Sequence, residues 1–235
     1  AGVGALHPET CAEMVIKYRA DLGVCLDGDA DRIVIIDNTG NIVDGDQLIG
    51  VLAKFLLDNN ELGKSEEVVG TVMSNFGLER YIKKIGANFY RSNVGDRYIV
   101  ERMLHNNSVF GGEPSGHIIF KKNSTTGDGI LAALKVIECL KFYNVSLAQL
   151  VSEVELVPQV LINVEVNEKR DFEQISSLQA VVREVENELK DNGRILLRYS
   201  GTENLARVMV EGSDEKLVHS SCQKIADVLK SEIGK

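Results

Sequence analysis

The chain has 235 residues, of which 44% are hydrophobic and 26% are charged, and this composition is typical of an ordinary globular protein with one large domain or two small ones. Its formal net charge of −9 argues against a general affinity for nucleic acid or anionic membrane, and no apolar segment approaches the length of a membrane span. The four cysteines are far apart and form no C-x-x-C pair, which is typical of reduced residues in a cytoplasmic protein.

Two short apolar segments near the start of the chain, residues 22–26 and 33–36, predict buried strands. The acidic hexapeptide between them, residues 27–32, predicts a tight connection, and we call it the acidic loop. The first residue is Ala1 rather than Met, and the first six residues are rich in glycine without a capped element behind them. We therefore expect an upstream part of the protein to be missing from this sequence, which carries no signal peptide.

Three carboxylates stand on alternate residues of the acidic loop, at Asp27, Asp29 and Asp31. Carboxylates held this close repel one another unless they are protonated or neutralised, and a hard divalent cation with oxygen ligands neutralises them well. We therefore predict a Mg²⁺ site, the alternatives being a solvated acidic turn or a loop in which one aspartate is a nucleophile. An EF-hand is excluded, because its sixth position would be Arg32 and its twelfth Asn38.

Strand-like and helix-like segments alternate between residues 41 and 150, which predicts an α/β domain with a mixed sheet. In chain order we expect helices over 48–56, 78–85, 97–104 and 129–140, and strands over 68–73, 87–91, 108–110 and 118–120. Asp128 is the expected N-cap of the last of these helices. Arg97 lies near a predicted helix N-terminus, where an anion is favoured, although it could equally be a solvated side chain beside an Asp96 cap.

A segment with three glycines, residues 111–117, interrupts the two short strands, and we call it the glycine loop. Interleaved glycines let a loop approach a polar ligand closely. Glu113 and Ser115 could then bond to sugar hydroxyls, and His117 could move a proton or pair with an anion. The alternative is a surface loop in which His117 has no function.

After a connecting segment around residues 144–158 the pattern changes to β-α-β-β-α, which predicts an α+β domain with an antiparallel hairpin. We expect strands over 159–166, 194–199 and 204–211, a helix over 175–189 and a final helix from Asp214. The hairpin gathers guanidinium groups, hydroxyls and a flexible backbone at Arg198, Ser200, Gly201, Thr202 and Arg207. Such a set suits a phosphate dianion, although a polar hairpin turn would look the same, and a site shared with the other loops would lie between domains.

Three motifs taken together resemble those of the α-D-phosphohexomutase superfamily: D-G-D-A-D-R at 27–32, G-G-E-P-S-G-H at 111–117 and R-Y-S-G-T-E-N at 198–204. The resemblance covers nearly the whole chain and implies three parts. Residues 1–40 would be the end of that superfamily's second domain, with the acidic loop. Residues 41–150 would be its third, sugar-binding α/β domain, and residues 151–235 its fourth, phosphate-binding α+β domain.

The resemblance also implies a role for each matching residue. Asp27, Asp29 and Asp31 would hold Mg²⁺, and Arg32 would stand beside the transferring phosphoryl group. Glu113 and Ser115 would grip sugar hydroxyls, and His117 would assist proton transfer. The distal phosphate of the substrate would be bound by Arg198, Ser200, Gly201, Thr202 and Arg207. The metal and the arginines would neutralise phosphoryl charge, which is most of what phosphoryl transfer requires.

Enzymes of this superfamily are isomerases that transfer a phosphoryl group through a phosphoserine and a bisphosphate intermediate. The segments at 94–98, 111–113 and 207–212 most resemble members that act on glucosamine phosphates, which implies a hexosamine phosphate substrate and a place in amino sugar and cell wall precursor synthesis. Members acting on glucose or mannose phosphates, a non-catalytic phosphosugar-binding fragment and a metal-dependent phosphohydrolase remain alternatives. The phosphorylated serine belongs to an N-terminal half that this sequence lacks, so we expect the chain to be inactive alone, and a homodimer stays open.

Overall fold

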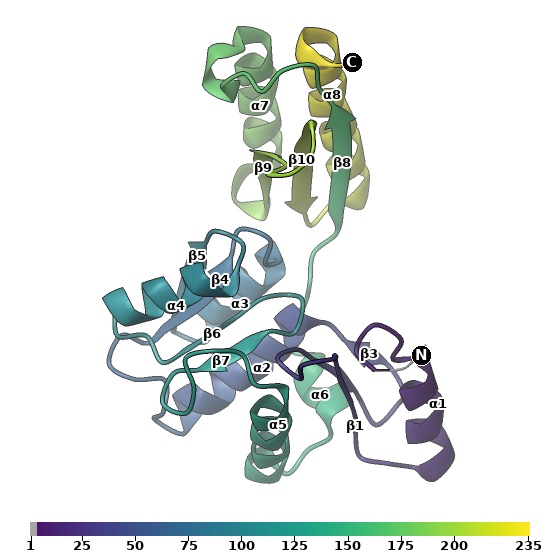
Figure 1. Cartoon of the computed structure of the whole chain (residues 1–235), viewed down its shortest axis with the longest axis vertical. Helices are drawn as coiled ribbons and strands as arrows, with labels where there is room; N and C mark the ends of the chain where they lie inside the picture. Colours follow the sequence, from purple (N-terminus) through teal and green to yellow (C-terminus); the bar gives the residue numbers. More distant parts are fainter. Residues whose placement is uncertain (1–3) are drawn as a thin grey trace. The chain divides into compact units, whose positions relative to one another are not determined.

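The computed structural model describes residues 4–235, which divide after Leu156 into two compact units (Figure 1). The first unit holds two sheets and six helices, and the second holds one sheet and two long helices. Within the described residues, no helix is both long enough and apolar enough to cross a membrane. The mixed α/β class predicted from the sequence is confirmed.

The first sheet carries the acidic loop. Its three strands, β1 (Gly23–Leu26), β2 (Ile33–Ile36) and β3 (Ile42–Val43), are antiparallel and lie in the order β1-β2-β3. Leu26 pairs with Ile33, so the acidic loop closes the β1–β2 hairpin as predicted. Helix α1 (Glu9–Tyr18) precedes this sheet and was not predicted, because no side chain caps its start and its C-cap, Arg19, takes a left-handed conformation without a glycine signal.

The second sheet is mixed, with strands in the order β5-β4-β6-β7. Strand β4 (Glu67–Thr71) is parallel to β5 (Asn88–Ser92) and to β6 (Phe110–Gly112), while β7 (Ile118–Phe120) runs antiparallel to β6. Its helices are α2 (Gly45–Asp58), α3 (Phe76–Lys84), α4 (Asp96–His105), α5 (Gly129–Tyr143) and α6 (Leu147–Val151). Asp128 caps α5 as predicted, whereas α6 falls in the segment expected to be only a connection.

The carboxyl ends of the three parallel strands meet at one edge of this sheet, because β4 is paired with β5 on one side and β6 on the other. The chain leaves β4 for β5 on one side of it, and then passes from β5 to β6 on the other side. The direction in which strands are added to the sheet therefore reverses next to β4. In open α/β sheets, ligands bind outside the carboxyl ends of strands where the order reverses in this way. The glycine loop follows β6 and lies at this edge.

The second unit has the predicted β-α-β-β-α order: β8 (Gln159–Glu165), α7 (Ser176–Leu189), β9 (Gly193–Tyr199), β10 (Leu205–Gly212) and α8 (Glu215–Ile233). Strand β10 is central and antiparallel to both neighbours. The core forms where α7 and α8 pack their apolar stripes on the sheet, around Val208, Val185 and Ile225, all fully buried. Asp214 caps α8 by accepting from the backbone N–H groups of Lys216 and Leu217.

A buried ion pair supports the second sheet. Glu67 of β4 is 5% exposed and accepts from Arg102 of α4 at 3.1 Å and 2.6 Å and from Ser108 Oγ at 2.6 Å. Burial by itself raises the pKa of Glu67, but the hydrogen bonds from Arg102 and Ser108 outweigh it and lower the pKa below its ordinary value. The carboxylate is therefore ionised and depends on its donors.

Replacing Arg102 with Met should destabilise the chain by about 2–3 kcal/mol at neutral pH, because it leaves a buried carboxylate without a charged donor. Since the pKa of Glu67 is lowered in the folded state, the lost stability is present above the ordinary carboxyl pKa of about 4.3 and disappears as the pH falls through the folded value. Urea unfolding at neutral and acid pH measures both effects. Lys83→Met, which breaks an ion pair whose lysine is 63% exposed, is the control and should cost under about 0.5 kcal/mol.

Candidate functional site

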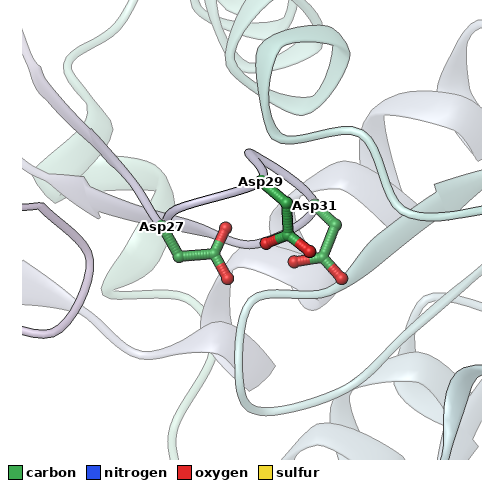
Figure 2. Close-up of side chains that lie close together, drawn as sticks. All are labelled: Asp27, Asp29 and Asp31. Atoms are coloured by element: carbon green, nitrogen blue, oxygen red, sulfur yellow. The ribbon is translucent and has the colours of Figure 1, made fainter.

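The three carboxylates of the acidic loop converge. Figure 2 shows Asp29 and Asp31 side by side, with Asp27 reaching toward them from the other end of the loop. One carboxylate oxygen from each lies within 4.8 Å of those of the others. Ala30 helps to bend the loop, because it takes a left-handed conformation with φ of 59° and its carbonyl accepts from Gly129 N–H at 2.9 Å. The sequence prediction that the three acids are gathered at one point thus agrees with the geometry.

Arg32 braces two of these carboxylates. Its Nε donates to Asp27 Oδ2 at 2.7 Å and its backbone N–H donates to Asp27 Oδ1 at 3.1 Å. Burial alone raises the pKa of Asp27, but the hydrogen bonds from Arg32 outweigh it and hold the pKa below its ordinary value. The same Nε lies 3.5 Å from Asp31 Oδ1, and the guanidinium stays 45% exposed. Arg32 therefore compensates part of the acidic charge while remaining accessible.

The donor set fits a hard divalent cation. Three carboxylate oxygen donors converge, and Asp31 Oδ1 is buried without a hydrogen-bond partner within the described residues. A carboxylate oxygen in this condition is costly unless a cation satisfies it. Carboxylate oxygens of this kind are the usual protein ligands of Mg²⁺.

The glycine loop lies directly against the acidic loop. Arg32 and His117 form an isolated antiparallel bridge, and Ile33 N–H donates to Gly116 O at 3.1 Å. Gly116 is required here, because its φ is +86° and an added Cβ would stand 2.0 Å from Ile33 O. Two motifs that are 80 residues apart in the sequence therefore share one site in the first unit.

His117 is buried, with only 6% of its surface exposed. Its Nδ1 lies 3.2 Å from Asp31 Oδ2, and its Nε2 accepts from Gly127 N–H at 3.0 Å. Sequence reasoning placed a helix N-cap at the neighbouring Asp128 and missed this contact. A backbone amide leaves no signal of its partner in the sequence, so only the packing of the loops reveals it.

Glu113 lies half-buried in the same site. Burial raises the pKa of Glu113 above its ordinary value, and the nearby charge of Asp96 raises this pKa further. His117 and Arg32 lower it in part. Asp96, at the start of α4, is therefore a neighbour of Glu113 that the sequence suggested only as a helix cap. Next to Asp96, the exposed Arg97 lies over the ring of Tyr98, with its Cζ 4.4 Å from the ring centroid. Ser115 is exposed at the tip of the glycine loop.

The second unit contains the predicted basic hairpin at the β9–β10 turn. Arg198 and Arg207 sit directly opposite each other in register, and the Nε of each is buried without a hydrogen-bond partner in the described residues. Burial, and then the charge of Arg207, lower the pKa of Arg198. Nη2 of Arg207 pairs with Glu203 Oε2 at 3.5 Å, so it is the two buried Nε groups that lack a partner within the described residues. Two arginines paired across the strands suit an anion, because like charges opposite each other are destabilising.

The turn itself is partly fixed. Ser200 is 4% exposed, its N–H donates to Leu205 O at 2.8 Å, and its carbonyl accepts from Lys169 Nζ at 2.6 Å. Gly201 and Thr202 are exposed at the tip. Lys169 lies 31 residues before Ser200 and no local pattern links them, so sequence reasoning missed it. The turn thus offers hydroxyls and backbone N–H groups beside the two arginines.

Two family models match the chain. Residues 44–157 match "Phosphoglucomutase/phosphomannomutase, alpha/beta/alpha domain III", and residues 161–228 match the C-terminal domain of the same family. Together these matches take in most of the chain. The first match ends and the second begins close to the boundary between the two compact units.

Curated relatives match along the whole chain. A phosphoglucosamine mutase from Geobacter metallireducens is 47% identical over 234 residues, covering 100% of this chain and 52% of its own length. One from Fusobacterium nucleatum is 44% identical over 98% of this chain and 51% of its own length. The chain thus spans about half the length of the curated relatives it matches.

Solved structures share the fold. An N-acetylphosphoglucosamine mutase from Aspergillus fumigatus, in complex with GlcNAc-6P and magnesium, superposes with a TM-score of 0.77 at 23% identity, over 97% of this chain and 56% of that one. A putative phosphomannomutase from Thermus thermophilus gives a TM-score of 0.64 at 20% identity, over 96% of this chain and 50% of that one. At these identities the likeness concerns the fold.

Proposed function

The chain belongs to the phosphoglucomutase/phosphomannomutase family, and we propose that it is the carboxyl-terminal half of a phosphoglucosamine mutase. Such an isomerase interconverts glucosamine 6-phosphate and glucosamine 1-phosphate through a phosphoserine and a bisphosphate intermediate. The observation that carries the proposal is the 47% identity to a phosphoglucosamine mutase along the entire chain. This activity would place the protein in amino sugar metabolism and cell wall precursor synthesis.

The first unit would hold Mg²⁺ through Asp27, Asp29 and Asp31. The ion would neutralise charge on the transferring phosphoryl group. Arg32, braced by Asp27 and still accessible, would add a second positive charge beside that group. Glu113 and Ser115 of the glycine loop would bind sugar hydroxyls, and Arg97 at the start of α4 would contribute a further basic group.

The second unit would bind the phosphate that is not being transferred. Arg198 and Arg207 would satisfy their buried Nε groups on the dianion, with Ser200, Gly201 and Thr202 completing the shell. Binding energy gained at this distal phosphate would be used to position the reacting one. Because the two phosphates of the bisphosphate intermediate are chemically alike, one distal site can serve both of its orientations.

The proposal requires an amino-terminal half that carries the phosphorylated serine, because the chain spans about half the length of its curated relatives. This half and a hexosamine phosphate are the proposed partners, and a homodimer stays a prediction. We also propose a cytoplasmic location, since all four cysteines are free thiols, as in a reducing compartment.

Turnover of glucosamine, glucose and mannose phosphates by the complete protein tests the proposal. We expect glucosamine 6-phosphate to have the highest kcat/KM and this chain alone to give none. A preference for glucose or mannose phosphate would favour the neighbouring activities of the same family. Absence of turnover for all three, with phosphate binding retained, would favour a non-catalytic phosphosugar-binding protein.

Gly45 is expected to control the sugar-binding position. It lies at the start of α2, where an added Cβ would stand 2.2 Å from Pro114 O of the glycine loop. Gly45→Ala should therefore push the loop away and raise KM for the sugar phosphate about tenfold, a binding loss of about 1.4 kcal/mol. Steady-state kinetics measure this, and thermal unfolding of the same variant separates it from a general loss of stability. An unchanged KM would mean that the glycine loop does not set the sugar position.

A further inference from the structure

His117 is held at both ring nitrogens, and we propose that it positions Asp31 for the metal ion instead of moving a proton to or from the sugar phosphate. The proposal rests on the Mg²⁺ site of the proposed function. It differs from the role that the family resemblance implies for this residue. Both of the relevant contacts, with Gly127 and with Asp31, lie within the first unit.

The contact with Gly127 determines which nitrogen carries the proton. A backbone N–H can only donate, so His117 Nε2, at 3.0 Å from Gly127 N, must present a lone pair. Because Nε2 is used as an acceptor, the N–H of the ring is placed on Nδ1. Nδ1 lies 3.2 Å from Asp31 Oδ2, so the N–H side of the ring is the side beside the carboxylate.

The surroundings fix this arrangement. His117 is 6% exposed, and its backbone is tied to Arg32 through the bridge between the two loops. On the other side, a Cβ at residue 127 would stand 2.6 Å from His117 Nε2 and Cε1, so only glycine lets this backbone come so near. With Nε2 bonded to Gly127, Nδ1 beside Asp31 and the ring buried, His117 is poorly placed to reach a sugar hydroxyl.

The position of His117 determines the orientation of the Asp31 carboxylate. Its Oδ2 lies beside His117 Nδ1, while its Oδ1 is buried without a hydrogen-bond partner among the described residues, with Arg32 Nε at 3.5 Å. The imidazole therefore fixes the rotation of the carboxylate and leaves the second oxygen for a cation. Partners of this kind, hydrogen-bonded to a ligand and not to the metal, typically change metal affinity or activity by about 10–100-fold when removed.

The tautomer is tested on this chain as it stands. Long-range ¹H–¹⁵N correlation NMR at neutral pH should show His117 Nδ1 protonated and Nε2 unprotonated. A protonated Nε2 would overturn the proposal, because that nitrogen would then be available as an acid. This measurement requires neither metal nor activity.

Two substitutions in the complete protein separate the roles. His117→Asn places an amide donor near the position of Nδ1, whereas His117→Gln places its amide near Nε2 and leaves no donor for Asp31. Titration with Mn²⁺, followed by water proton relaxation, should give H117N an affinity within about twofold of wild type and H117Q one about tenfold weaker. Asp29→Asn, which removes a proposed ligand, verifies that the titrated ion occupies this site.

Kinetics with Mg²⁺ complete the test. The loss of kcat in H117Q should be largely recovered by excess Mg²⁺, and H117N should show the smaller loss at limiting Mg²⁺. Equal Mn²⁺ affinity in all three proteins, with kcat lost in both variants at saturating Mg²⁺, would establish proton transfer and overturn the proposal. If the wild-type protein turns over no glucosamine phosphate, the proposed function fails, but the tautomer and the Mn²⁺ affinities still decide the role of His117.

Discussion

Replacing Asp29 with Asn should lower kcat of the complete protein by about 10³-fold without unfolding it. A bound Mg²⁺ contributes several kcal/mol to phosphoryl transfer, and about 4 kcal/mol corresponds to three orders of magnitude in rate. Asp29 is exposed and, within the described residues, makes no hydrogen bond or ion pair. Its loss would therefore remove the proposed metal ligand and little else. Steady-state kinetics with glucosamine 6-phosphate, together with thermal unfolding, measure the two quantities.

The neighbouring aspartates would give a less clean result. Asp27 also holds Arg32, and Asp31 also lies 3.2 Å from His117 Nδ1, so substitutions there change the shape of the acidic loop as well. Asp21→Asn is the matched control, since Asp21 is an exposed acid in the same part of the chain and should leave kcat within about twofold of wild type. If Asp29→Asn kept more than a tenth of the wild-type kcat, the acidic loop would be a solvated turn and not a metal site.

Elements with strong local signals could be predicted from the sequence. The strands around the acidic loop, the β9–β10 hairpin and the capped starts of α5 and α8 all agree with the structure, because each depends on the spacing of apolar residues or on an N-cap a few residues away. Helix α1 has no such signal, since no side chain caps it and Val15 is its one buried residue. Helix α6, with five residues, is too short to show periodicity.

The candidate site, too, could be predicted from the sequence only in part. The gathering of Asp27, Asp29 and Asp31 follows from their spacing in one tight loop, which the sequence shows directly. The electrostatic effect of Asp96 on Glu113, and the contact of Gly127 with His117, depend on which strand ends lie at the same edge of the sheet. The sequence does not carry this order. Sequence reasoning therefore named the candidate site residues but not the backbone and side-chain groups packed against them.

Replacing Arg198 with Met should raise KM for glucosamine 6-phosphate about 100-fold and leave the free energy of unfolding unchanged or slightly higher. Arg198 would contribute a charge-assisted contact to the distal phosphate, and losing such a contact costs about 2–3 kcal/mol. In the ligand-free hairpin, however, Arg198 faces Arg207 and its Nε has no partner within the described residues, so its removal relieves repulsion. Most substitutions at half-buried residues lower both binding and stability, whereas this one should separate them.

Inorganic phosphate provides a direct measurement on this chain. A ligand that binds only the folded state raises the free energy of unfolding by about 2.7 kcal/mol at 100 times its Kd, so phosphate should increase the Tm of the wild-type chain and not that of R198M. Arg183→Met is the matched control, because Arg183 is exposed on α7 and is outside the hairpin. Equal stabilisation of R198M and wild type by phosphate would contradict an anion site at the paired arginines, since one of its two guanidinium groups would be absent.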